Sequence, residues 1–166
     1  MSIYLNADDI FRVGVQIEIN GKLFYEMAAQ QSREAGAKKL FRELADWENQ
    51  HIELFEKLRL QLPETAKDEN LFDPGSELEM YIKATADSHI FIRNKDISSL
   101  VSTLKTPQEV LDLAITFEKD SVVFYSIMKK AIPESFGKER IDSLINEEIQ
   151  HIAMLMQKKE RIGNHG

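Results

Sequence analysis

The sequence predicts an all-α fold, in which four long helices form two antiparallel hairpins of one bundle. Apolar residues recur with the 3.6-residue period of an amphipathic helix along four long stretches. The chain contains only 7 Gly and 4 Pro, so few residues interrupt these stretches. A set of residues in the first half also recurs 100 positions later, which indicates two copies of one helical hairpin.

The two copies share identical residues at equivalent positions. They have in common two glutamates, an aromatic pair, a leucine and the tripeptide Gln-His-Ile, namely Glu18/Glu118, Glu48/Glu148, Phe24/Phe124, Tyr25/Tyr125, Leu44/Leu144 and 50–52/150–152. Each copy therefore consists of a helix with one glutamate on its inner face, followed by a helix with the motif Glu-x-x-His.

Local signals predict where the four helices begin. Asn6, with Asp9 three positions later, is typical of an N-cap followed by an acidic first turn. Thr106, followed by Pro107 and Glu109, is a second helix start with Pro at the first helical position. The break between the first two helices is short, so they should be antiparallel neighbours. We expect helices over residues 7–34, 37–61, 107–131 and 137–161.

Residues 63–106 are expected to form a long crossover that lets the third helix run beside the first pair. After a polar loop, Ser76 with Glu79 resembles a capping box, which predicts a short helix ending near Phe91. Residues 94–105 show no clear period and are expected to be irregular. The chain of 166 residues fits a single domain, residues 1–166.

Composition excludes several classes of function. The formal net charge of −7 argues against nucleic acid as the main partner. The absence of cysteine excludes disulfides, zinc–thiolate sites and iron–sulfur clusters. The sequence also lacks a signal-like start and an apolar run long enough to cross a bilayer. We therefore expect a cytoplasmic protein that is not bound to a membrane.

Each Glu-x-x-His motif lies within a helical stripe that is otherwise apolar. Residues i and i+3 lie on the same face of a helix, so the carboxylate and the imidazole can reach one point. The two stripes consist of Leu44, Glu48, His51, Phe55 and Leu58, and of Ile141, Leu144, Glu148, His151 and Leu155. Burying such groups is costly unless they are compensated, and a metal ion is the simplest compensation.

A second glutamate in each hairpin should lie at the level of the motif. In an antiparallel hairpin, residues at equal height are symmetric about the turn. Glu18 and His51 are symmetric about the first expected turn, and Glu118 and His151 are symmetric about the second. Small residues flank both glutamates and leave room beside them: Gly14 and Gly21 in the first helix, Ala114 and Ser121 in the third.

Packing the hairpins face to face would bring four carboxylates and two imidazoles together: Glu18, Glu48, His51, Glu118, Glu148 and His151. Two divalent cations would balance the four negative charges. Ligation rich in oxygen, with one imidazole for each ion, favours iron or manganese over zinc. One Glu-x-x-His motif arises often by chance, but two, each preceded by a glutamate 30 positions earlier, are specific.

Five further residues are candidates for contacts with these motifs. Tyr25 and Tyr125 lie seven residues after the first glutamate of each copy, on the same face. They either donate a hydrogen bond to a ligand carboxylate or are ordinary core residues, and the sequence leaves both alternatives open. Trp47 and Glu147 occupy equivalent positions and are interpreted as a packing residue and a surface residue. His89 has no partner at a ligand-like spacing, so a ligand role is not favoured.

This constellation resembles the ferritin-like di-iron carboxylate bundle and, within it, the rubrerythrin group. The resemblance covers all four helices and all six proposed ligands. It implies two iron ions as cofactors, with manganese or zinc as alternatives. It further implies bridging of the two ions by Glu48 and Glu148, and terminal ligation by Glu18, Glu118, His51 and His151.

Two features depart from typical rubrerythrins. Ser121 stands where they carry a further glutamate, which exchanges with a histidine as the iron changes redox state, so no such exchange is expected here. Rubrerythrins also often end in a four-cysteine rubredoxin domain that supplies electrons. Since this chain has no cysteine, its electron donor would be a separate protein such as a rubredoxin.

The resemblance implies an oxidoreductase that reduces hydrogen peroxide or dioxygen. The alternative is a ferroxidase or iron-handling protein without peroxide turnover. A metal-free helical interaction module is a third hypothesis, but it would leave four buried carboxylates uncompensated. The long crossover could lie across a second copy of the chain, so we expect a homodimer.

Overall fold

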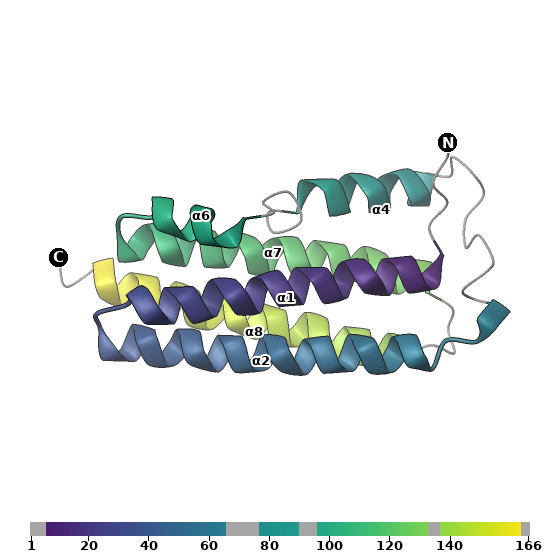
Figure 1. Ribbon diagram of the computed structural model, residues 1–166, viewed down its shortest axis with the longest axis horizontal. Helices are drawn as coiled ribbons and strands as arrows, with labels where there is room; N and C mark the ends of the chain where they lie inside the picture. The colour runs from purple at the N-terminus through teal and green to yellow at the C-terminus, as the bar shows by residue number, and fades with distance from the viewer. Residues whose placement is uncertain (1–5, 66–76, 90–95, 133–136, 164–166) are drawn as a thin grey trace.

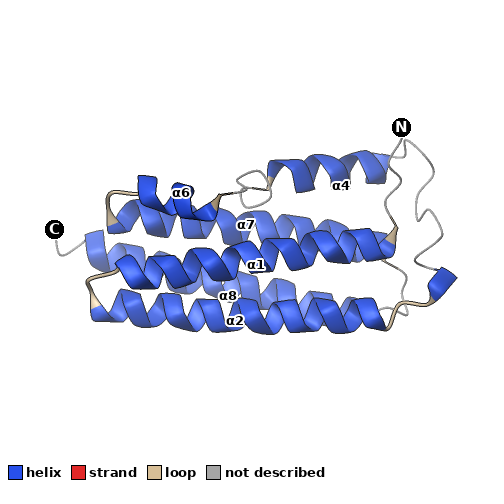
Figure 2. Cartoon of the chain, viewed as in Figure 1, coloured by secondary structure: helices blue, strands red, loops and turns tan. Residues whose placement is uncertain are grey.

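The computed structural model is a bundle of four long helices (Figure 1). The structure describes residues 6–65, 77–89, 96–132 and 137–163. Its long helices are α1 (Ala7–Gln31), α2 (Ala35–Leu60), α7 (Pro107–Ala131) and α8 (Lys138–Gly163). Helix α1 packs on α2 and α7 packs on α8, so the prediction of an all-α bundle of two antiparallel hairpins is confirmed. Within these ranges no strand is present (Figure 2).

Capping side chains fix the first turns of α1 and α7 as predicted. The Asn6 side chain accepts a hydrogen bond from the Asp9 amide (2.9 Å), and the Asp9 carboxylate accepts one from the Asn6 amide (3.1 Å). Thr106 and Glu109 form the same reciprocal pair at α7, with distances of 3.2 and 3.1 Å. Each box satisfies two amides that the helix itself leaves unpaired.

The break between α1 and α2 lies earlier than predicted. Helix α1 ends at Gln31, and α2 already begins at Ala35, so Gly36 belongs to a helical turn and not to the break. The reason is a side-chain cap. The Glu34 carboxylate accepts hydrogen bonds from the amides of Gly36 and Ala37, each at 2.7 Å. These bonds offset the low helix propensity of Gly36, so α2 begins one residue before it.

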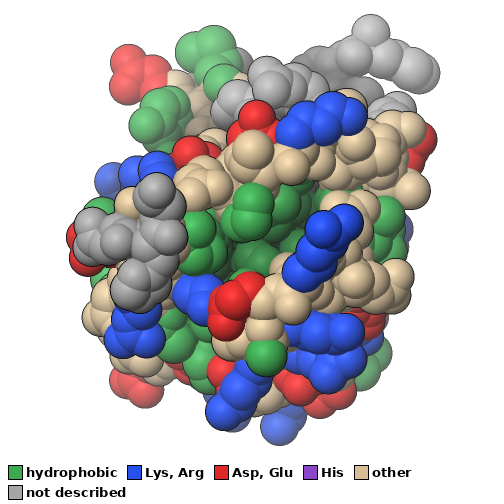
Figure 3. All heavy atoms as spheres, turned by 90° about the vertical axis from the view of Figure 1, so that its left-hand side faces the viewer, with side chains coloured by type: hydrophobic (Ala, Val, Ile, Leu, Met, Phe, Trp, Pro, Cys, Tyr) green, Lys and Arg blue, Asp and Glu red, His purple; other side chains and the backbone are tan. Residues whose placement is uncertain are grey.

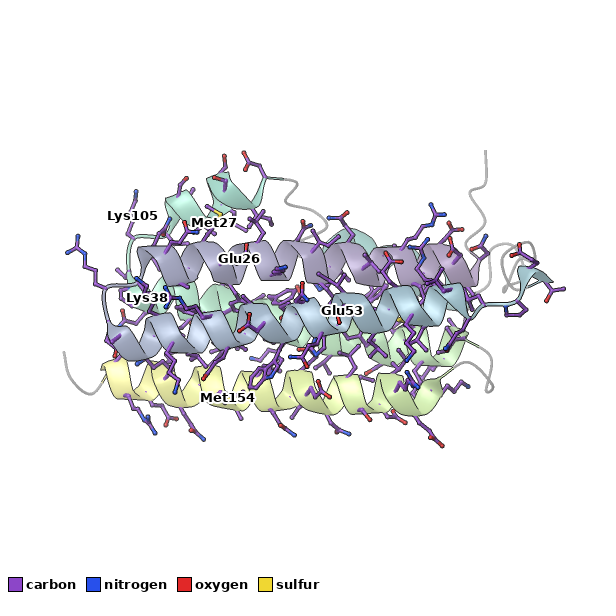
Figure 4. All side chains as sticks on the ribbon, turned by 60° about the horizontal axis from the view of Figure 1, so that its bottom comes forward. Glu26, Met27, Lys38, Glu53, Lys105 and Met154 are labelled. Atoms are coloured by element: carbon purple, nitrogen blue, oxygen red, sulfur yellow. The ribbon has the colours of Figure 1, made fainter. Side chains whose placement is uncertain are left out.

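Two short helices of the crossover cover the bundle on one side (Figure 1). Helix α4 (Glu77–Ser88) packs on α7, and α6 (Ile97–Thr103) packs on α1. Met27 lies on the side of α1 that α6 covers (Figure 4). The capping residue predicted at Ser76 and the predicted helix end near Phe91 lie outside the described residues.

The prediction that residues 94–105 are irregular was wrong, because they contain α6. Asp96 caps this helix by accepting a hydrogen bond from the Ser99 amide (3.0 Å). Ile97 and Val101, one turn apart, are buried against the bundle. Its three apolar residues, Ile97, Leu100 and Val101, span barely more than one turn, too short a stretch to reveal a sustained period, so tertiary packing forms this helix.

Aromatic rings fill much of the interior of the bundle. The largest fully buried side chains include Phe11, Phe24, Tyr25, Phe55, Phe117, Phe124 and Tyr125. They come from α1, α2 and α7, whereas α8 contributes aliphatic residues to the core. Among the described helices, none combines the length and the apolar character that crossing a membrane would require.

The small residues beside the first inward glutamate make room for these rings. A Cβ atom on Gly21 would lie 2.5 Å from Cζ of Phe117 and 3.4 Å from the carboxyl carbon of Glu48. A Cβ atom on Gly14 would lie 3.3 Å from the ring of Phe55. The room predicted beside Glu18 is therefore occupied mainly by aromatic side chains of the core.

We expect Gly21→Ala to destabilise the protein. The added methyl group must displace the Phe117 ring, and overpacking of this kind costs about 1–3 kcal/mol. Alanine recovers only about 1 kcal/mol of helix propensity. Urea unfolding followed by circular dichroism measures the difference. Gly163→Ala is the matched control, because nothing lies within 4 Å of the added atom; a Gly21→Ala variant as stable as the wild type would contradict the packing.

Candidate metal centre

The structure brings the six predicted ligand residues together inside the bundle. Each of the four long helices contributes, with Glu18 on α1, Glu48 and His51 on α2, Glu118 on α7, and Glu148 and His151 on α8. Every one of these side chains is at most 2% exposed. The centre is therefore enclosed by the protein on all sides.

The six residues form two overlapping groups of potential ligands. In each group, one oxygen or nitrogen atom per residue lies within 4.8 Å of those of the other three. The groups are Glu18, Glu48, His51 and Glu148, and Glu48, Glu118, Glu148 and His151. Glu48 and Glu148 belong to both groups, as two neighbouring ions with bridging carboxylates would require. That these residues bind metal ions stays a prediction.

The hydrogen bonding of the centre is incomplete in a way that fits cations. Among the described residues, the buried side-chain atoms without a hydrogen-bond partner are Glu18 Oε2, both oxygens of Glu48, His51 Nδ1, Glu118 Oε2 and Glu148 Oε1. Each such atom costs about 1–3 kcal/mol when nothing compensates it, and more if it is charged. All of them are electron-pair donors of the kind that iron or manganese binds, so the residues present fit a pair of divalent ions.

Crowding of carboxylates shifts their proton affinity. Burial raises the pKa of Glu48 well above its usual range, and the negative charge of Glu18 raises it further. Burial likewise raises the pKa of Glu118, together with the charge of Glu148. A carboxylate in these surroundings is hard to ionise unless a positive charge lies beside it.

The histidines respond to the same charges in the opposite sense. Burial disfavours the imidazolium form of His51, but the charges of Glu148 and Glu18 outweigh it and raise the pKa well above its usual value. Burial also opposes protonation of His151, but hydrogen bonds and charges from Glu118 and Glu148 raise its pKa to about 9. Without cations, the centre therefore holds protons.

Each buried tyrosine binds a glutamate of the opposite hairpin. The Tyr25 hydroxyl donates a hydrogen bond to Glu118 Oε1 (2.5 Å), and the Tyr125 hydroxyl donates one to Glu18 Oε1. Of the two alternatives that the sequence left open, the structure supports a hydrogen bond to a proposed ligand. One oxygen of each glutamate is thereby occupied, and Oε2 of each remains unpaired.

Trp47 packs against the core and Glu147 is exposed, as interpreted, but each also contacts a histidine of the centre. The Glu147 carboxylate lies 3.1 Å from Nε2 of His51, and hydrogen bonding by His51 lowers the pKa of Glu147. The Trp47 ring stacks on the imidazole of His151, with centroids 4.6 Å apart and planes 7° apart. These equivalent positions therefore contact the histidine of the opposite hairpin in two different ways.

His89 of the crossover lies next to the centre, which its sequence context did not indicate. It is 1% exposed, and its Nε2 lies 3.3 Å from the hydroxyl of Ser121. Its ring contacts Phe117 edge to face, with centroids 5.7 Å apart. Burial lowers the pKa of His89 to about 4, so the imidazole is neutral at physiological pH. A neutral histidine from the crossover thus fills the space beside Ser121.

For the metal-free protein, we expect the free energy of unfolding to fall as the pH rises from about 6.5 to 9. His151 has a pKa raised from 6.5 to about 9, so the folded protein keeps a proton that the unfolded chain has already lost. One such proton changes the free energy by at most about 1.4 kcal/mol per pH unit. The raised pKa values of Glu48, Glu118 and His51 act in the same direction.

Bound cations would replace these protons and reduce the pH dependence. Thermal unfolding over this pH range, with a chelator and with added divalent ions, measures both effects. A melting temperature in chelator that stays constant or rises with pH would contradict the assigned proton binding.

Comparison with known proteins supports the fold. No protein-family model matches the chain, and no curated protein matches it. A similar solved structure is the crystal structure of a Thermotoga maritima protein provisionally described as a ferritin-like diiron-carboxylate protein. The two sequences are 28% identical, the alignment covers 95% of this chain and 96% of that one, and the TM-score is 0.67. The chain thus has the ferritin-like fold, and the comparison favours the ferritin-like diiron family without singling out rubrerythrins.

Proposed function

We propose that this protein is a di-iron oxidoreductase that reduces hydrogen peroxide or dioxygen. The observation that carries the proposal is the sharing of Glu48 and Glu148 by two buried four-residue groups. The similar Thermotoga protein is described as a diiron-carboxylate protein, which favours iron over manganese or zinc here. Iron bound by these residues would supply reducing electrons to the oxygen–oxygen bond, one from each ion.

The residues around the centre hold its ligands in place. Burial and the charge of Glu118 raise the pKa of Tyr25, so its hydroxyl keeps its proton and continues to donate to that carboxylate. Tyr125 does the same for Glu18. Each bond holds Oε1 and leaves Oε2 for a cation. The surrounding aromatic shell keeps bulk water away from the oxidant.

The two histidine ligands have unequal surroundings, and we propose that the two metal positions differ in affinity. A carboxylate that accepts the Nε2 proton of an imidazole makes Nδ1 a stronger donor. Glu147 is placed to do this for His51, whose Nδ1 faces Glu148 Oε1 at 3.2 Å. The imidazole of His151 stacks on Trp47 instead. The position beside His51 should therefore be occupied first.

We expect calorimetric titration of the metal-free protein with Co²⁺ to show two binding steps. Glu147→Ala should weaken the tighter step about 10- to 100-fold, because the imidazole loses its carboxylate partner. Trp47→Glu should strengthen the weaker step, because it gives His151 the same partner. Glu160→Ala, an exposed change on the same helix, is the control. A single class of sites in the wild type, or a Glu147→Ala variant with unchanged affinities, would contradict the proposed inequality.

The alternative function is that of a ferroxidase. Ser121 favours this alternative, because a serine cannot provide the additional carboxylate that redox-linked ligand exchange would need. His89 contacts the same residue, and the structure describes no carboxylate in its place. Selectivity for peroxide should accordingly be weaker than in a full rubrerythrin.

Stopped-flow oxidation of the di-ferrous protein tests the proposal. Hydrogen peroxide should oxidise it faster than dioxygen at equal concentration, and added ferrous ions should not be consumed beyond two per chain. Dioxygen that matches peroxide, with continued consumption of ferrous ions, would favour the ferroxidase. If neither oxidant changes the near-ultraviolet spectrum of the loaded protein, both functions are wrong.

The proposal includes two partners. The chain has no cysteine and therefore cannot carry a rubredoxin-type centre, so the electrons would come from a separate protein such as a rubredoxin. A homodimer is also part of the proposal. Ile19 and Leu23, one turn apart on α1, are 44% and 41% exposed, and a second copy could cover them.

A further inference from the structure

An open cavity of about 900 Å³ lies at the end of the bundle where α1 and α8 end and α7 begins. Four buried apolar residues from three helices form its floor: Ala28, Ala37, Phe41 and Leu111. Figure 3 views this end of the molecule and shows a hydrophobic hollow surrounded by Lys and Arg side chains. The proposed metal chemistry does not use this cavity.

Cationic side chains line the same cavity. They are Arg33, Lys105, Lys158 and Arg161. Lys158 forms an ion pair with Glu34, the one carboxylate of the lining. The other three have no ion pair with any residue that the structure describes. Figure 4 shows Lys105 at this end of the bundle.

The local charge is opposite to that of the whole protein. Four cations and one carboxylate give the cavity a formal charge of +3, whereas the complete chain has −7. Unpaired cations around an apolar floor would repel a cationic ligand, and a neutral ligand would leave them unused. The four cationic side chains form the rim of the cavity, and a bound anion would lower their electrostatic energy.

The floor of the cavity is connected to the metal centre by direct contacts. The Phe41 ring stacks on the ring of Tyr25, with centroids 6.2 Å apart and planes 20° apart. The Tyr25 hydroxyl in turn donates to Glu118. A ligand that contacts Phe41 is therefore separated from a proposed metal ligand by only two aromatic side chains.

We propose that this cavity binds a small organic anion. Its apolar body would lie on the floor formed around Phe41, and its carboxylate or phosphate would contact the cations of the rim. The volume is within the range of small-molecule sites, about 300–1,000 Å³. This binding does not depend on metal, so it can be tested on the protein with or without ions.

Isothermal titration calorimetry with three naphthalene probes tests the proposal. The probes 1-naphthoate, 1-naphthol and 1-naphthylmethylamine share one apolar body and differ in charge. The anion should bind at least about tenfold more tightly than the cation, a difference of about 1.4 kcal/mol, with the neutral probe between them. Equal binding of all three, or no binding of the anion at millimolar concentration, would overturn the proposal.

Three variants separate the rim from the floor: one changes the rim, one is its control, and one fills the cavity. The double variant Lys105→Glu with Arg161→Glu should abolish the preference for the anion. Lys39→Glu with Lys38→Glu makes the same change of charge on α2, at residues that do not line the cavity, and should leave the preference unchanged. Val110→Trp should fill the cavity and weaken all three probes. Circular dichroism establishes that each variant is folded, and an anion preference that survives the rim variant would place the binding elsewhere.

Two further anions identify the chemistry of the headgroup. Titration with 1-naphthyl phosphate compares phosphate with carboxylate on the same ring. Inorganic phosphate alone should bind at least about tenfold more weakly than 1-naphthyl phosphate, because it cannot use the floor. If inorganic phosphate binds as tightly as the naphthyl compound, the floor contributes nothing and the proposal of an organic anion is wrong.

Discussion

The structure depends on the cost of burying four carboxylates at one level of a helical bundle. Carboxyl groups this close together cannot all be ionised in an apolar interior unless positive charge lies among them. Protons on the carboxylates and histidines provide that charge in one state of the protein, and divalent cations would provide it in another. The bundle is thus built around a position that requires positive charge.

The surrounding residues follow from this constraint. A carboxylate that is to face a cation must be held in position and keep its negative charge. Each of the two tyrosines holds one glutamate by donating a hydrogen bond to one of its oxygens. The rings that carry the hydroxyls are themselves held by core neighbours, among them Phe41 and Phe55. Gly21 belongs to the same arrangement, because a side chain at this position would collide with Phe117 and approach Glu48.

Much of the fold was predictable because a helix transmits register over long distances. The symmetry of Glu18 and His51 about a short turn was enough to predict that they share one level, although the turn lies a few residues from its expected place. Contacts between hairpins were not predictable, since no spacing within one hairpin fixes how α2 lies against α8. For this reason the contact of the exposed Glu147 with His51 was not predicted. His89 was missed for a related cause: no spacing in the sequence fixes how the crossover helix α4, which ends just before His89, packs on α7.

The contacts of positions 47 and 147 have a consequence for the internal repeat. Two identical hairpins that associated as separate chains would be related by symmetry, so both positions would hold the same residue and both histidines would have the same neighbour. A tryptophan on one histidine and a carboxylate on the other cannot occur in such a symmetric pair, but they can when both copies belong to one chain and diverge independently. Covalent fusion of the repeats therefore gives this protein something that a symmetric pair could not have: two halves of one centre with separately adjustable chemistry.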